Sequence, residues 1–167
     1  GSIIAYLMMT PGPDIWKVLV GVAIATGISF GIASPIVKIA GGKNSLEAAI
    51  QAVGELLHQL GYVDETYVDA MQEREKLITT YMGMGVAIPH GTSQAKGTVK
   101  KTGIVFLQYP QGVDFGDEKA QLVFGIAGIG EEHLNLLAKI CEALGDEEVL
   151  EKMKTTDDID WIMERLS

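Results

Sequence analysis

Cysteine and basic side chains are scarce in this sequence, and each shortage excludes a class of protein. Cys141 is the single cysteine among 167 residues, so neither an internal disulfide nor a zinc site of paired cysteines can form. Lysine and arginine together number 13, against 22 aspartates and glutamates, which leaves a net charge of −9. Because nucleic acids bind basic surfaces, we expect no nucleic acid partner, whereas a basic protein partner would suit this acidity.

The glycine motifs of nucleotide-binding proteins are also missing. A dinucleotide-binding turn requires Gly-x-Gly-x-x-Gly, and here Gly128-x-Gly130 is followed by His133 at the third position. No phosphate loop ending in Gly-Lys-Ser/Thr occurs. We therefore expect neither a dinucleotide-binding site nor direct hydrolysis of nucleotides.

Charge is absent from residues 18–37, an apolar stretch long enough to cross a membrane as a helix. Within it, Gly27 and Gly31 stand at the Gly-x-x-x-Gly spacing that lets membrane helices pack closely. The stretch therefore predicts an N-terminal apolar helix that is able to span a membrane.

This composition divides the chain into two parts. We expect residues 1–35 to form the apolar segment and residues 36–167 to form a separate domain. Lysines follow the apolar stretch, which slightly favours a cytoplasmic position for the domain. An alternative is that part of the stretch belongs to the domain, with a strand over residues 35–40 that begins at a proline.

The domain has the alternating helix and strand patterns of a layered α/β fold. Apolar residues at helical spacing predict helices over residues 46–60, 64–75, 131–144, 147–154 and 158–166. Short apolar runs predict strands near residues 77–82, 86–90, 102–108 and 122–127, with turns at 109–112 and 114–117. Because several of these runs are apolar on both faces, we expect a mixed β-sheet flanked by helices.

The stretch Val86-Ala87-Ile88-Pro89-His90-Gly91-Thr92 contains the leading candidate for chemistry. Pro89 fixes its own φ and favours an extended residue before it, while Gly91 has no Cβ and allows a close approach. His90 should therefore lie at the mouth of a strand in a fixed orientation, where imidazole can act as a base, metal ligand or nucleophile. Taken alone, the tripeptide is equally compatible with a surface histidine at the end of a strand.

Three further residues are weighed beside His90. His133 lies in the first turn of a predicted helix, where the helix dipole favours a neutral ring that can donate to an anion, although an ordinary exposed helix residue is the alternative. Arg74 has a guanidinium suited to phosphate oxygens, although a salt bridge to a neighbouring acid is the alternative. Zinc binding by His90 and His133 lacks a third ligand, and Cys141 falls on an apolar helix stripe, which predicts a core residue.

Together these segments resemble a known family. Arg74-Glu75-Lys76-Leu77, Thr80-Tyr81-Met82-Gly83 and Val86–Thr92 are similar to the active-site region of the enzyme IIA domain of the mannitol/fructose class of the bacterial phosphotransferase system. Residues 101–113, Phe115-Gly116 and Glu132-His133-Leu134 resemble its mannitol branch. The resemblance covers roughly residues 36–167.

The resemblance implies a phosphotransferase with a role for each matched residue. His90 matches the histidine that accepts a phosphoryl group from phospho-HPr and passes it to a cysteine of an enzyme IIB domain. His133 matches a second active-site histidine that contacts the phosphoryl group, and Arg74 matches an arginine that balances charge. No ATP, metal or other cofactor is implied.

The first residues resemble the end of the membrane-spanning enzyme IIC domain of a mannitol permease, on Gly1–Ala5 and Met9-Thr10-Pro11. This implies a cytoplasmic domain tethered to the inner face of the cell membrane, with enzyme IIC or the membrane contacted through residues 18–37. The chain departs from full permeases because no enzyme IIB domain lies between the two parts. A regulatory module of the same fold, phosphorylated but signalling through protein partners, is the alternative function.

Overall fold

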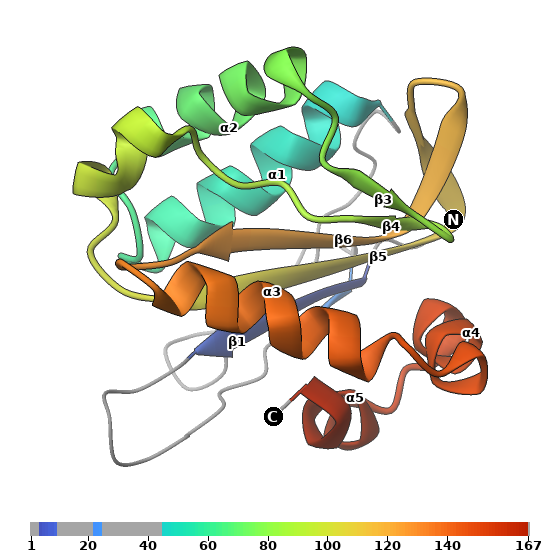
Figure 1. Ribbon diagram of the computed structural model, residues 1–167. Coiled ribbons are helices and arrows are strands. Elements are labelled where there is room, and N and C mark those ends of the chain that lie inside the picture. The colour runs from blue at the N-terminus through green and yellow to red at the C-terminus, as the bar shows by residue number, and fades with distance from the viewer. Residues whose placement is uncertain (1–3, 10–21, 25–44, 167) are drawn as a thin grey trace.

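The computed structural model describes residues 4–9, 22–24 and 45–166, which form a sheet with helices on both faces (Figure 1). In chain order the elements are β1 (Ile4–Met9), β2 (Val22–Ile24), α1 (Leu46–Gln59), α2 (Thr66–Leu77), β3 (Tyr81–Gly83), β4 (Val86–Ala87), the 3-10 helix η1 (Ser93–Thr98), β5 (Gly103–Phe115), β6 (Glu118–Ala127), α3 (Glu132–Ala143), α4 (Glu147–Thr155) and α5 (Ile159–Leu166). The predicted α/β class is confirmed.

The sheet of these residues is mixed, as the sequence predicts. Its strand order is β2-β1-β5-β6-β4-β3. β4 runs parallel to β6, and the other neighbouring pairs are antiparallel. Because β4 and β6 are parallel neighbours, the loops that follow them leave the sheet at the same edge.

Helices cover the two faces of the sheet separately. In Figure 1, α1 and α2 lie on one face, and α3, α4 and α5 lie on the other. Alternate residues of β5 serve the two cores: Val105 and Leu107 pack with α1, whereas Ile104 and Phe106 pack with α3 to α5. This alternation follows from the period of two along a strand, and it explains why both faces of β5 are apolar.

Side-chain caps define the starts of two helices. Ser45 is the N-cap of α1, and its hydroxyl accepts from the Ala48 amide at 3.2 Å. Asp146 caps α4 by accepting from the amides of Glu148 (2.8 Å) and Val149 (3.3 Å). Such side chains satisfy amides that lack a partner within the helix. α2 begins at Thr66, slightly later than predicted.

The turn predicted at residues 109–112 is wrong. β5 continues through this segment to Phe115, and a register shift against β6 lies between Gln108 and Val113. Gly112 has a φ of 76° there, a conformation that glycine adopts without strain. The Pro and Gly that suggested a turn are accommodated by a β-bulge inside a long hairpin.

The N-terminal part differs from the predicted helix where it is described. Val22–Ile24 forms β2 and pairs with β1, which in turn pairs with β5. Val and Ile are β-branched and favour strands, which agrees with this pairing. Among the described residues, no helix is long and apolar enough to cross a membrane. The remainder of residues 18–37, the strand considered at 35–40 and the boundary at residue 35 lie outside the described residues.

The apolar stripe predicted for α3 is correct in part. Ile140, one of its predicted positions, is buried, together with Leu136. Cys141, expected in the core, is exposed, and Leu134, which the predicted stripe also included, is 64% exposed. The cause is that α3 turns only a narrow face to β6 and α5, and Leu134 and Cys141 fall outside it.

The close contact between β6 and α1 generates a stability prediction. A Cβ on Gly125 would lie 2.5 Å from the Cβ of Val53, and both atoms are fixed to backbone, so α1 would have to move away. We expect Gly125→Ala to lower the free energy of unfolding by about 1–3 kcal/mol in urea denaturation. Gly97→Ala is the control, because nothing lies within 4 Å of the added atom. Equal stabilities of the two variants would contradict this packing.

Candidate functional site

Parallel pairing of β4 and β6 brings two of the predicted site residues together. His90 follows β4 and forms an isolated parallel bridge with Ile126 near the end of β6. His133 lies in the first turn of α3, which begins after the loop that leaves β6. The ring centroids of His90 and His133 are 5.0 Å apart, with 56° between the ring planes. The structure therefore brings these two predicted residues side by side, although they are far apart in the sequence.

One hydrogen bond fixes the chemistry of the His90 ring. Its Nδ1 lies 2.8 Å from the main-chain oxygen of Ile88. A carbonyl oxygen can only accept, so Nδ1 must carry the proton and donate it. In the neutral ring, Nε2 then holds a free lone pair. Nε2 is thus the ring nitrogen of His90 whose lone pair is available.

The backbone of Ile88 is itself held, through its amide, by a chain of hydrogen bonds that leads back to α2. The Ile88 amide donates to the Thr80 oxygen at 3.0 Å. The Thr80 amide donates to Glu75 Oε2 at 2.7 Å, and the Thr80 hydroxyl donates to the same oxygen at 2.5 Å. Thr80 is 4% exposed, so this chain runs through protected surroundings. It connects the acidic side chain of Glu75 to the backbone beside His90.

Both histidines are biased towards the neutral state. Burial lowers the pKa of His90 most, and the positive charge of Arg74 lowers it further, while the bond to Ile88 and the carboxylate of Glu75 oppose this. The pKa of His133 is also lowered, first by burial and then by the charges of His90 and Lys96. Since histidine normally titrates near pH 6.5, both rings are neutral at pH 7.

The position of His133 depends on the close contact of Gly128 with the first turn of α3. A Cβ on Gly128 would lie only 2.6 Å from the His133 Cα and 2.7 Å from its amide nitrogen. Thr102 secures the same loop, because its hydroxyl accepts from the Ile129 amide at 3.1 Å and donates to the Glu132 carboxylate. The glycine noted in the sequence as part of a failed nucleotide motif thus serves this close approach.

Arg74, the third predicted residue, lies at the edge of this group. It sits on the last turns of α2, and its Nη1 donates to the Ile78 oxygen at 2.6 Å. Its charge reaches His90, as the lowered pKa of that ring shows. The structure therefore places Arg74 within electrostatic range of His90 while its guanidinium bonds to its own helix end.

Sequence reasoning missed three residues that act on the pair. Tyr67, Glu75 and Lys96 influence the backbone or the charge around the two rings. Glu75 stood in the Arg74–Leu77 motif without an assigned role, and Tyr67 falls within the helix predicted over residues 64–75. Nothing in the local sequence marks Lys96, which belongs to η1.

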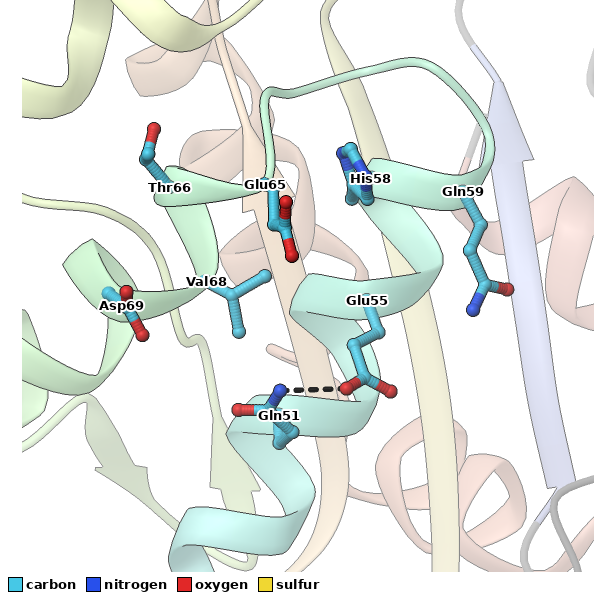
Figure 2. A pocket seen from close by; sticks show the side chains of 8 residues that line it. All are labelled: Gln51, Glu55, His58, Gln59, Glu65, Thr66, Val68 and Asp69. Atoms are coloured by element: carbon cyan, nitrogen blue, oxygen red, sulfur yellow. Dashed lines mark hydrogen bonds between the residues drawn. The ribbon is translucent and has the colours of Figure 1, made fainter.

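A surface hollow of about 480 Å³ lies elsewhere, between α1 and the start of α2 (Figure 2). The side chains that line it are largely polar: Gln51, Glu55, His58, Gln59, Glu65, Thr66, Val68 and Asp69. Of the three histidines, only His58 borders it, with Nδ1 3.1 Å from the Val63 oxygen. Among the described residues, no group of three or more His, Cys, Asp or Glu side chains could hold a metal ion. The hollow therefore gives no support to a second catalytic centre.

With the paired histidines and the mixed sheet established, the class of protein can be stated. Residues 37–167 match the family described as "Phosphoenolpyruvate-dependent sugar phosphotransferase system, EIIA 2". The chain belongs to this family, which confirms the resemblance read from the sequence, and it is therefore a phosphotransferase-system component.

Three relatives place the chain within the family. It is 48% identical over 124 residues to the PTS system mannitol-specific EIICBA component of Escherichia coli K12. The alignment covers 72% of this chain and 20% of the E. coli protein. It is 46% identical over 127 residues to the mannitol-specific phosphotransferase enzyme IIA component of Enterococcus faecalis, covering 66% and 88%. In the solved complex of mannitol enzyme IIA with phosphorylated enzyme IIB from E. coli, the matching chain has a TM-score of 0.70 and 46% identity, with coverage of 73% and 87%. The chain thus spans about a fifth of the EIICBA relative.

The electrostatic balance around His90 can be tested by titration. Arg74→Gln should raise the pKa of His90, because the guanidinium lowers it, and Glu75→Gln should lower that pKa, because the carboxylate raises it. Long-range ¹H–¹⁵N NMR of the ring measures both. Arg165→Gln is the control: it also removes one positive charge, but beside Trp161, and it should leave the pKa of His90 unchanged.

The same titration has a consequence for stability with a defined sign. The folded state holds His90 and His133 with lowered pKa values, so the unfolded chain binds more protons between those values and about pH 6.5. The two neutral rings contribute fully to the free energy of unfolding above about pH 6.5. This contribution is lost as the pH falls from there through the lowered pKa values of the folded state. In the NMR titration, a His90 pKa that is unchanged in both Arg74→Gln and Glu75→Gln would contradict the charge balance.

Proposed function

We propose that this chain is a mannitol-type enzyme IIA that carries a phosphoryl group on Nε2 of His90. It takes the group from phospho-HPr and passes it to a cysteine of an enzyme IIB domain. The observation that carries the proposal is the Nδ1 bond to Ile88, which leaves Nε2 as the free nitrogen beside His133. No cofactor or metal takes part in this chemistry.

The transfer balances with the groups present. The lone pair on His90 Nε2 attacks phosphorus in line, a P–N bond forms there, and the donor's P–N bond breaks with its electron pair on the donor nitrogen. His90 keeps its Nδ1 proton throughout, because that proton is bonded to the Ile88 oxygen. In the second transfer, the thiolate of enzyme IIB attacks phosphorus and the electron pair returns to Nε2.

His133 and Arg74 supply stabilisation at the transferred group. A neutral His133 can donate one N–H to a phosphoryl oxygen while adding no charge to the His90 ring. Arg74 balances the negative charge that arrives with the phosphoryl group, since its guanidinium suits phosphate oxygens. Donors held in place before reaction are the main source of catalysis in such transfers.

The surface around the site favours a protein donor over a small molecule. Leu77 and Ile78 are 72% and 68% exposed at the end of α2, beyond Arg74. Ile129 and Leu134, on either side of His133, are 48% and 64% exposed. Exposed apolar side chains gathered around a reactive group are typical of protein docking surfaces. We propose that HPr and enzyme IIB use this surface in turn. For the E. coli relative, a complex of mannitol enzyme IIA with phosphorylated enzyme IIB has been solved.

Transport of mannitol is favoured over the regulatory alternative by the relatives. Both curated relatives described above are named as mannitol-specific components. The EIICBA name also joins a IIA component to IIB and IIC components in one chain, which supports action at the cytoplasmic face of the membrane.

Phosphoryl transfer tests the function directly. Incubated with phosphoenolpyruvate, enzyme I and HPr, the chain should gain one acid-labile, alkali-stable phosphate by mass spectrometry. His90→Ala should abolish it, and His133→Ala should retain it but slow its formation by about 10²-fold, because one donor to the phosphoryl group is lost. His58→Gln is the matched control, since this histidine lies away from the pair.

Absence of phosphate on the folded wild-type chain with active donors would overturn the proposal. If the chain is phosphorylated, uptake of mannitol in cells that supply enzyme IIB and IIC distinguishes transport from regulation. Phosphorylation without restored uptake would favour the regulatory module.

The placement of His133 generates a second prediction for this site. Gly128→Ala should push the start of α3 away from His90 and slow phosphorylation by about tenfold or more. Gly145→Ala, at the other end of the same helix, meets its nearest atoms at 3.4 Å and should leave the rate unchanged. Stopped-flow or quench measurements of single turnovers give both rates. Equal rates would show that His133 needs no such positioning.

A further inference from the structure

A buried tyrosine hydroxyl from α2 holds the backbone next to His90. Tyr67 lies in the first turn of α2 and is 3% exposed. Its hydroxyl accepts from the Gly91 amide at 2.9 Å and donates to the Ile126 oxygen at 2.7 Å. Gly91 is the residue after His90, and Ile126 is the residue that His90 bridges. The hydroxyl therefore joins the two chain segments that meet at the site.

This hydroxyl occupies a particular step of the parallel ladder. The Ile126 amide donates to the Pro89 oxygen at 2.9 Å, as expected for a parallel bridge centred on His90. The next group in such a ladder is the amide after His90, which would pair with the Ile126 oxygen. Here the Tyr67 hydroxyl stands between that amide and that oxygen, accepting from one and donating to the other. His90 is thus held on both sides, by Pro89 and through Gly91.

Packing makes the position of the hydroxyl rigid. A Cβ on Gly91 would lie 2.5 Å from Cε2 and 2.9 Å from Cζ of Tyr67, so the ring lies directly against the glycine backbone. This contact gives a physical reason for glycine after His90. Burial raises the pKa of Tyr67 to about 12, so the hydroxyl stays protonated and remains a donor at neutral pH.

We propose that Tyr67 is a positioning residue for phosphoryl transfer, which rests on the proposed role of His90: its hydroxyl sets the distance between Gly91 and Ile126 and so aims the His90 ring. Without the hydroxyl, two buried polar groups lose their partner. The amide and the oxygen would then move together or admit water, and either change would turn the backbone next to His90. Small misplacements of a reacting group cost rate more than affinity.

Tyr67→Phe is the variant that tests this role, because it removes only the hydroxyl. Steady-state and single-turnover phosphorylation by phospho-HPr should show kcat reduced by about tenfold, with KM for phospho-HPr within about twofold of wild type. The phosphate should still form on His90. Tyr109→Phe is the matched control, a 4% exposed tyrosine of the same core on β5, and its kcat should equal the wild-type value.

The ring itself gives a readout that does not require turnover. Long-range ¹H–¹⁵N NMR should show the Nδ1–H tautomer alone in wild type and a second tautomer population in Tyr67→Phe. A wild-type chain that takes no phosphate would overturn the proposed function, and the tautomer populations would still decide the positioning role. A folded Tyr67→Phe chain with wild-type kcat and a single tautomer would overturn the positioning role.

If Tyr67→Phe does not fold, Gly91→Ala tests the same contact from the other side, because the added methyl displaces the ring. A similar fall in kcat would support the proposal, and a wild-type kcat would overturn it.

Discussion

The parallel pairing of β4 with β6 is the contact on which the site depends. It sends the loops after both strands out of the same edge of the sheet, so that His90 and His133 meet although they are far apart in sequence. Parallel strands require a crossover, and here the η1 segment and the β5–β6 hairpin supply it. Everything specific about the site is added to this edge: α2 contributes Tyr67, Arg74 and Glu75, and α3 contributes His133.

Burial then decides the charge state of the pair. Two imidazoles within 5.0 Å could not both be protonated without repulsion, and their partial burial already disfavours protonation. Arg74 and Lys96 act in the same direction, although the chain as a whole has a net charge of −9. In the proposed function, the positive charges of Arg74 and Lys96 would help to receive an anionic phosphoryl group, while the acidic surface would attract basic partners.

Much of this molecule could be predicted from sequence where the causes are local. The start of α1 at Ser45 and of α4 at Asp146 follows from side chains that cap their own helices. Where the cause is a distant partner, prediction failed. Continuation of β5 past Pro110 depends on pairing with β6, and the exposure of Cys141 depends on which face α3 turns to the sheet. His90 was found because its neighbours are distinctive, whereas Tyr67 was not, because a buried tyrosine on a helix has the same pattern whether or not its hydroxyl is used.

The hydrogen bond between His90 Nδ1 and the Ile88 oxygen also bears on the direction of phosphoryl transfer. It lies on the far side of the ring from Nε2, so it can persist whether or not Nε2 carries a substituent. A carrier whose loaded and unloaded forms share one framework needs no conformational change between receiving and delivering. Such a carrier imposes no direction of its own. The phosphoryl-transfer potentials and the relative amounts of the loaded donor and the empty acceptor would then decide which way phosphate flows.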